Sequence, residues 1–337
     1  MTRLTEEAVF RSKMGSILFK RYRGKGIALM FHEVQRDVDA ELRTGCAPEQ
    51  LERVILAVRR QGRDIVTVDE GLQRLADPGG KPFALLTFDD GYRDNVENAL
   101  PVLEKYNAPI TLFVPDGLLE RSAYAWWLGL RELLKQRSTL HVAPMQAEFG
   151  LYDLPSKTSA LRQITSWIGT SQVRAEALGS LFANNEIDLP ELIERYVMSP
   201  KDLKAVARHS LVTIGAHTSS HRFLSNLKEE ECEADIRKNK QYLEALLGQD
   251  INYLAYPYGT ETACGQREED IAARLGFKAS FTTRPGQLFH AHLDHLQLLP
   301  RIDVGYAPQS ASALDARLTG LHRRMQAGAS KPVATLS

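Results

Sequence analysis

The chain has 337 residues, enough for one large α/β domain or two ordinary ones with a sizeable hydrophobic core. Its 42 basic and 42 acidic side chains balance, so no overall field attracts nucleic acid, and no nucleic-acid partner is expected. Three cysteines without C-x-x-C spacing predict neither a disulfide framework nor a thiolate zinc site. We expect reduced thiols at Cys46, Cys232 and Cys264.

The N-terminal region contains one short apolar stretch, GSILF at residues 15–19, between basic side chains. This stretch is too short for a signal-peptide core or a membrane span, so we expect a cytoplasmic protein without a transmembrane segment. The basic residues from Lys13 to Lys25 allow peripheral contact with an anionic membrane. A solvated lead-in to the first strand is the simpler interpretation.

Short β-branched or aromatic runs then alternate with helical patterns. This alternation predicts βα units with mostly parallel strands, and seven or eight such units predict a barrel of the (β/α) type. Ser199, Pro200 and Asp202 have the arrangement of an N-cap, a first-turn proline and a capping-box acid. The expected strands are 27–31, 64–68, 84–88, 110–114, 212–216, 253–256, 278–282 and 298–302, and the expected helices lie near 48–61, 69–76, 94–106, 200–208, 229–247 and 266–275.

Residues 121–198 interrupt this alternation with several amphipathic helical stretches and no clear strand. We expect them to form a helical insertion, or lid, on a single catalytic domain spanning residues 1–337, with a flexible C-terminal tail at 326–337. The adjacent Trp126 and Trp127 either pack the insertion or line a sugar-sized cleft. Packing is the commoner outcome for tryptophan.

Three polar clusters directly follow predicted strands. They are Asp89-Asp90-Gly91-Tyr92, His217-Thr-Ser-Ser-His221 and Pro257-Tyr258-Gly259. In a barrel built from βα units, the loops after the strands meet on one face. We therefore expect the three clusters to form one site.

Two histidines four residues apart point the same way if their loop enters a helical turn. Two histidines and one carboxylate can hold a divalent metal and leave positions open for water and substrate. One of the adjacent aspartates can then be a ligand, and the other a base for a water whose pKa the ion lowers toward about 7. Alone, Asp-Asp-Gly is usually a turn and His-x-x-x-His a solvated pair. Their shared position at strand ends favours a site.

The segments TFDDGY, HTSSH and AYPYG resemble, in this order, the motifs of the polysaccharide deacetylase family, carbohydrate esterase family four. The resemblance covers about residues 27–120 and 199–304. It implies a distorted (β/α)7-type barrel that removes N- or O-acetyl groups from sugars with a divalent metal, foremost Zn²⁺, although Co²⁺, Ni²⁺ and Fe²⁺ accept the same ligands. It also implies that Asp89 is the general base and that the metal ligands are Asp90, His217 and His221.

The resemblance places Tyr258 where the family uses a backbone N–H to stabilise an oxyanion. Many members orient the base with an arginine at the position that is Ala255 here. We expect Arg301 to reach Asp89 instead, as in related exopolysaccharide deacetylases, the alternative being a surface ion pair. His32, at the end of the first predicted strand, is a candidate for the catalytic face without an assigned role.

The late Leu-x-His motif of the family has no clear counterpart. The triplets that end at His290 and His295 precede a predicted strand instead of following one. A solvated, histidine-rich turn that includes His292 is favoured over a second metal site.

The expected activity is metal-dependent hydrolysis of an N-acetyl group on an amino sugar such as N-acetylglucosamine. The resemblance implies a cell-surface glycan or its precursor, in exopolysaccharide biosynthesis, and the substrate can be a glycan, a nucleotide-linked sugar or a lipid-linked sugar. One alternative is a non-catalytic glycan-binding module, suggested by Ala255 and the missing acid. Another is a non-haem iron oxygenase, although the second aspartate and the βα pattern favour hydrolysis. The sequence fixes no oligomeric state.

Overall fold

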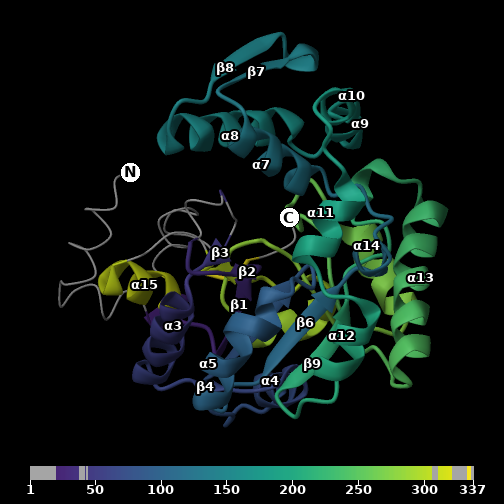
Figure 1. The fold of residues 1–337 in the computed structure, drawn as a ribbon. Coiled ribbons are helices and arrows are strands. Elements are labelled where there is room, and N and C mark those ends of the chain that lie inside the picture. The colour runs from purple at the N-terminus through teal and green to yellow at the C-terminus, as the bar shows by residue number, and fades with distance from the viewer. Residues whose placement is uncertain (1–19, 38–41, 43–44, 306–309, 321–331, 335–337) are drawn as a thin grey trace.

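The computed structural model describes residues 20–37, 42, 45–305, 310–320 and 332–334. Its centre is a curled parallel sheet with the strand order β11-β10-β9-β6-β5-β1-β12, and β4 pairs with β5 (Figure 1). A parallel bridge between Phe281 in β11 and Leu299, shortly before β12, brings the two edges of the sheet together. The predicted distorted (β/α)7-type barrel is confirmed. The strands are β1 (Gly26–Phe31), β4 (Asp64–Ile65), β5 (Phe83–Asp89), β6 (Ile110–Val114), β9 (Val212–Ala216), β10 (Tyr253–Ala255), β11 (Ala279–Phe281) and β12 (Ile302–Asp303).

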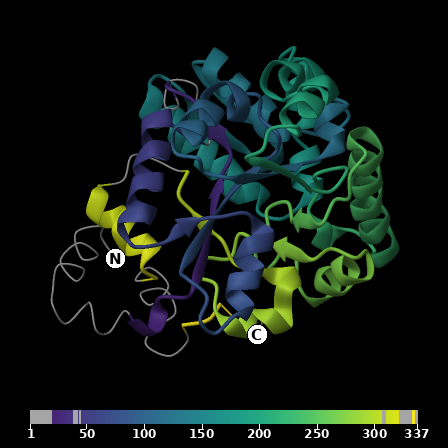
Figure 2. The same ribbon diagram turned by 90° about the horizontal axis from the view of Figure 1, so that it is seen from below.

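Helices surround this sheet, as the view from below shows (Figure 2). They bury the outer face of each strand while a second apolar cluster buries the inner face, so the strands read as nearly continuous apolar runs. The helices of the barrel are α3 (Pro48–Arg60), α4 (Val68–Ala76), a π-helical turn η2 (Asn95–Ala99) that leads into α5 (Leu100–Lys105), α6 (Asp116–Leu119), α12 (Pro200–Val206), α13 (Glu229–Leu247), α14 (Gln266–Arg274) and α15 (Ala311–Leu318). Short 3-10 helices are η1 (Lys20–Tyr22), η4 (Leu224–Asn226) and η5 (His290–Leu298), and a small parallel pair joins β2 (Glu33–Val34) to β3 (Gly45–Cys46).

Strand β5 shows how the sequence positions the site. Leu86 and Phe88 pack into the large core between the sheet and the helices, whereas Leu85 belongs to a second cluster formed mainly by other strands. Because side chains alternate along a strand, Thr87 and Asp89 share the face of Leu85. The last residue of the strand is thus a carboxylate directed away from the helices.

The insertion at 121–198 forms a layer over one end of the barrel (Figure 1). Its own core includes Trp126, Leu130, Ile164 and Phe182. The expectation that it lacks strands is wrong, because β7 and β8 pair as an antiparallel hairpin. These strands have four residues each, and the turn between them places Gln146, not glycine, at a positive φ, so the usual hairpin signal is missing. The elements are α7 (Trp126–Gln136), β7 (Thr139–Val142), η3 (Ala143–Met145), β8 (Ala147–Gly150), α8 (Leu154–Ile168), α9 (Gln172–Glu176), α10 (Gly179–Asn184) and α11 (Leu189–Tyr196).

The outcome differs for three further sequence expectations, which concern the cap of α12 and the bounds of two strands. The capping box at the start of α12 is confirmed, with the Ser199 and Asp202 side chains each bonded to the backbone N–H of the other. The strand expected at 64–68 ends at Ile65, because Thr67 caps α4. The strand expected at 298–302 is wrong, since η5 extends to Leu298 and the strand begins only at Ile302.

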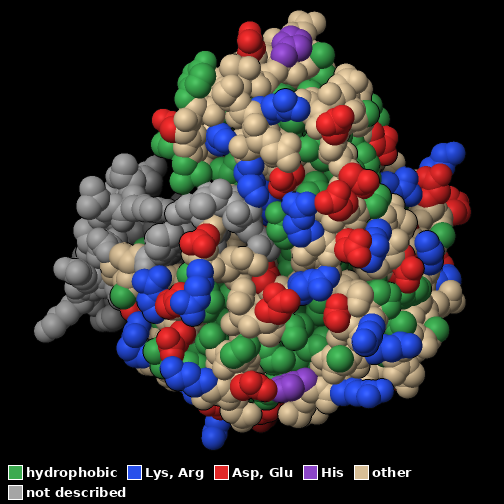
Figure 3. All heavy atoms as spheres, in the orientation of Figure 1, with side chains coloured by type: hydrophobic (Ala, Val, Ile, Leu, Met, Phe, Trp, Pro, Cys, Tyr) green, Lys and Arg blue, Asp and Glu red, His purple; other side chains and the backbone are tan. Residues whose placement is uncertain are grey.

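The three cysteines are free and buried, as expected. No described helix is both long and apolar enough to cross a bilayer. Basic and acidic side chains are interspersed on the face drawn in Figure 3, in keeping with the zero net charge. The tail at 326–337 lies outside the described residues except for 332–334, and the single-domain organisation stays a prediction.

Leu86→Ala should lower the free energy of unfolding by about 2–5 kcal/mol, because it leaves a cavity in the core between β5 and the helices. Leu86 is 1% exposed, whereas Leu56 on α3 is 44% exposed. Leu56→Ala is the matched control and should change stability by less than about 0.5 kcal/mol. Urea denaturation measures both, and equal losses would contradict the assigned core.

Candidate active site

The motif loops meet at the C-terminal ends of the strands, as parallel strands require. Asp89 ends β5, and the residue after β1 is His32. The loops also share an unusual backbone: four non-glycine residues, Asp90, Thr218, His221 and Tyr258, have φ of 72°, 61°, 53° and 62°. Such left-handed conformations cost of order 1–3 kcal/mol each and persist only where the surrounding structure imposes them.

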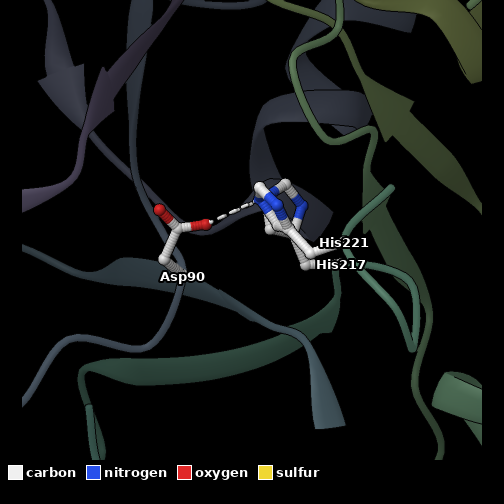
Figure 4. Close-up of side chains that lie close together, drawn as sticks. All are labelled: Asp90, His217 and His221. Carbon is white, nitrogen blue, oxygen red and sulfur yellow. Dashed lines mark ion pairs between the residues drawn. The ribbon is translucent and has the colours of Figure 1, made fainter. Parts of the chain in front are cut away.

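Asp90, His217 and His221 form a compact buried cluster. One ligand atom from each lies within 4.8 Å of the others. Oδ1 of Asp90 is 3.1 Å from Nε2 of His221 and 3.4 Å from Nε2 of His217, and Figure 4 shows the carboxylate facing both rings. Asp90 Oδ1 and His221 Nδ1 are buried without a hydrogen-bond partner. A carboxylate and two imidazoles with an orphaned oxygen suit a divalent ion such as Zn²⁺, so the residues present fit a metal.

A second layer of hydrogen bonds fixes the loop that carries the histidines. The Nδ1–H of His217 donates to the carbonyl oxygen of Ala255 at 2.7 Å, because a carbonyl can only accept. Its Nε2 lone pair is therefore free for the cluster. The backbone N–H of His217 donates to Asn239 Oδ1 at 2.7 Å, and Asn239 in turn donates to Asp116 at 2.9 Å. The loop is thus held in place from α13 and α6.

Asp89 lies in a bidentate ion pair with Arg301. The two distances are 2.7 and 2.8 Å, and the side chains are 3% and 0% exposed, which excludes the surface ion pair that the sequence left open. Burial alone would raise the pKa of Asp89, but the charges of Arg301 and His217 and the hydrogen bonds from Arg301 outweigh burial, so this pKa lies below its usual value. Arg301 also donates to Thr87 and to the carbonyl of Thr282, which fixes its guanidinium.

Tyr258 and His32 complete the set of residues expected from the sequence. The Tyr258 ring stacks on Phe223, with centroids 3.7 Å apart, and its hydroxyl accepts a hydrogen bond from Trp126 Nε1 at 2.9 Å. Within the described part of the chain, no acceptor is bonded to the backbone N–H of Tyr258. His32 lines the same cavity as Asp89. The structure therefore brings all seven predicted site residues together.

The cavity at this site has a volume of about 310 Å³ and is roofed by the insertion. Trp127 Nε1 donates to Tyr92 at 2.9 Å, and its ring lies 4.6 Å from that of His221. Both tryptophans line the cavity and also pack in the insertion, so the two alternatives for this pair hold at once. Tyr92, a member of the first predicted cluster, also lines the cavity, whereas sequence reasoning missed the charged lining residues Arg131 and Asp303.

The histidine-rich segment at 290–295 lies elsewhere. His292 bonds to the backbone of Phe289, and His295 bonds to Glu269. Among the described residues, the single cluster with metal-binding geometry is that of Asp90 with His217 and His221. The described structure thus provides no support for a second metal site.

A family comparison decides the classification, because the model for polysaccharide deacetylases matches residues 76–280. The chain belongs to the polysaccharide deacetylase family. It is 23% identical over 303 residues to poly-beta-1,6-N-acetyl-D-glucosamine N-deacetylase of Escherichia coli (strain K12), covering 84% of this chain and 37% of that protein. The chain thus spans little more than a third of the length of this relative.

Solved structures of similar fold include Streptococcus pyogenes deacetylase PplD in complex with acetate. The TM-score is 0.56 at 19% identity, covering 87% of this chain and 97% of that one. IcaB from Ammonifex degensii gives a TM-score of 0.55 at 20% identity, covering 88% and 97%. At these identities the comparison establishes a shared fold.

Zn²⁺ at about one hundred times its dissociation constant should raise the free energy of unfolding by about 2.7 kcal/mol, because the cluster exists only in the folded state. His217→Ala should abolish both Zn²⁺ binding in calorimetry and this stabilisation. His141→Ala, an exposed histidine on β7, is the matched control and should retain both. Equal Zn²⁺ affinity in the two variants would argue against the cluster as the binding site.

Arg301→Met should destabilise the fold by about 3–5 kcal/mol at pH 7, because it leaves Asp89 buried and unpaired. In the wild type, the lowered pKa of Asp89 contributes stability above the ordinary carboxyl pKa of about 3.9, and this contribution is lost as the pH falls through the lowered value. In the variant, burial raises the pKa of Asp89. As the pH falls, protonation therefore removes the buried unpaired charge, and the loss of stability becomes smaller.

The difference in unfolding free energy between wild type and Arg301→Met should therefore shrink from pH 8 to pH 5. Urea denaturation at both pH values measures it. Arg195→Met, an arginine 48% exposed on α11, is the control and should show little change at either pH. A pH-independent loss would mean that Arg301 acts through packing alone.

Proposed function

We propose that this protein is a metal-dependent deacetylase that hydrolyses the N-acetyl group of an amino sugar in a cell-surface glycan or its precursor. The observation that carries the proposal is the joint placement of a buried Asp-His-His cluster and an ionised, arginine-bound aspartate at one cavity. A cluster of this composition leaves positions open for water and a carbonyl oxygen. The neighbouring carboxylate supplies a base.

Asp90, His217 and His221 would hold the metal, which is Zn²⁺ in this proposal. The ion would supply polarisation of water and of the acetamide carbonyl. Asp89, kept ionised by Arg301, is the base that takes a proton from the attacking water. The backbone N–H of Tyr258 is the donor for the oxyanion, a contribution of about 2.7–4 kcal/mol in other hydrolases.

The proton for the leaving amine is assigned to His32. It lines the cavity on the side of β1 and β12, whose register pairs Met30 with Asp303, and Asp303 lines the cavity as well. Histidine is the side chain that most often acts as a general acid or base in enzymes. His32→Gln should therefore lower kcat without weakening Zn²⁺ binding.

The proposed substrate unit is N-acetylglucosamine. Support comes from the relative named for poly-beta-1,6-N-acetyl-D-glucosamine, which this chain matches along 84% of its own length. The cavity of about 310 Å³, roofed by two indoles, suits a sugar ring, because aromatic faces pack against its C–H groups. The product would be acetate and a free amine.

Zn²⁺-loaded protein should release acetate from N-acetylglucosamine oligosaccharides. Asp89→Asn keeps the shape of the side chain but removes the base, so its rate should fall by about 10²–10⁴-fold. A coupled acetate assay with calorimetric Zn²⁺ titration measures both properties. Oligosaccharide binding without acetate release, unchanged in Asp89→Asn, would replace this proposal with a glycan-binding role.

A further inference from the structure

Arg131 on α7 is a buried arginine that the proposed chemistry does not use. It is 3% exposed and lines the cavity, although it belongs to the insertion and not to the barrel. Its Nη1 donates to both oxygens of Glu33, at 2.8 and 3.1 Å, and Glu33 is fully buried. Its guanidinium lies over the ring of Tyr196, 4.8 Å from the centroid. One edge and one face of the guanidinium are therefore occupied.

The other edge of the guanidinium is free. Nε and Nη2 of Arg131 are buried and have no hydrogen-bond partner. In arginine these two nitrogens present parallel N–H groups that bind two oxygen atoms side by side. A buried donor pair without acceptors is costly, since each unsatisfied group costs about 1–3 kcal/mol. Arg131 as a residue lines the cavity, so a ligand bound there is the candidate source of these acceptors.

The charges around the cavity decide what kind of acceptor this is. Arg131 is the one lysine or arginine among the described residues that line the cavity, whereas the acids there are Asp89, Asp90 and Asp303. With Glu33, these carboxylates match the charges of Arg131, Arg301 and a divalent ion. Among the described residues, no further lysine or arginine at the cavity is left to bind a phosphate or a carboxylate, and an anion on the free edge would lie close to Glu33.

We propose that the free edge of Arg131 binds hydroxyl or carbonyl oxygens of an uncharged sugar residue and so positions the substrate over the cluster. The inference rests on the proposed function and narrows it to a neutral glycan, in preference to a nucleotide-linked sugar. Neighbouring hydroxyls on a sugar ring, or an acetamide oxygen beside a hydroxyl, offer the two acceptors that this edge requires. The insertion thereby takes part in substrate recognition.

Arg131→Lys tests this role, because lysine can keep an ion pair with Glu33 but lacks the two-donor edge. In Asp89→Asn protein loaded with Zn²⁺, the added Arg131→Lys change should raise the Kd for an N-acetylglucosamine oligosaccharide at least about tenfold, as expected for one lost charge-assisted hydrogen bond. With Asp89 intact, KM should rise by a similar factor and kcat should change less. Arg195→Lys, on the exposed side of the insertion, is the matched control and should change neither.

If Arg131→Lys does not fold, Glu33→Leu/Arg131→Leu removes both charges of the buried pair together, which buried pairs often tolerate. It should show the same loss of affinity with Zn²⁺ binding retained. Unchanged Kd and KM in a folded variant would overturn the inference and leave the proposed function standing. So would tighter binding of nucleotide-linked N-acetylglucosamine than of the oligosaccharide in wild type. Oligosaccharide binding that depends on Arg131 without acetate release would support the inference and overturn the function.

Discussion

Two adjacent carboxylates, buried at the end of one strand, impose the main constraint on this structure. Neither Asp89 nor Asp90 can stay ionised in a low-dielectric interior without a positive partner of its own. Asp89 is the last residue of β5, and Asp90 lies in the turn after it at a left-handed φ of 72°, so Arg301 neutralises one carboxylate and two imidazoles face the other. The chain therefore has to bring β12 and the loop after β9 to the end of β5, and the curled parallel sheet does so.

The fold and the centre of the site follow largely from local sequence. The βα alternation predicts the barrel, and the motifs at three strand ends predict which side chains meet, because parallel strands fix where their C-terminal ends lie. The failures have local causes. The β7–β8 hairpin is short and lacks a glycine turn, and the segment before β12 contains a 3-10 helix where an apolar run indicates a strand.

The remaining site residues depend on contacts that sequence spacing does not encode. Arg131 meets Glu33 across 98 positions, and Arg301 meets Asp89 across 212. Only the second pair was anticipated, from the resemblance to exopolysaccharide deacetylases and from the position of Arg301 near the end of the expected strand 298–302. In the sequence, nothing distinguishes Arg131 from an exposed helical arginine, and only the fold shows that it is buried. The insertion is thus coupled to the barrel through polar contacts, two of them from indole N–H groups to Tyr92 and Tyr258.

The left-handed backbone at Asp90, Thr218, His221 and Tyr258 has a consequence for how this protein tolerates mutation. Glycine adopts such conformations without strain, so by conformation alone it would relieve the fold at each of these positions. At Asp90 and His221, however, a change to glycine would remove a side chain that the cluster needs to hold a metal. At these two positions, the backbone and the side chain are therefore under opposing selection. Wherever activity ceases to be selected in a descendant, the cluster should erode there first, while the barrel persists.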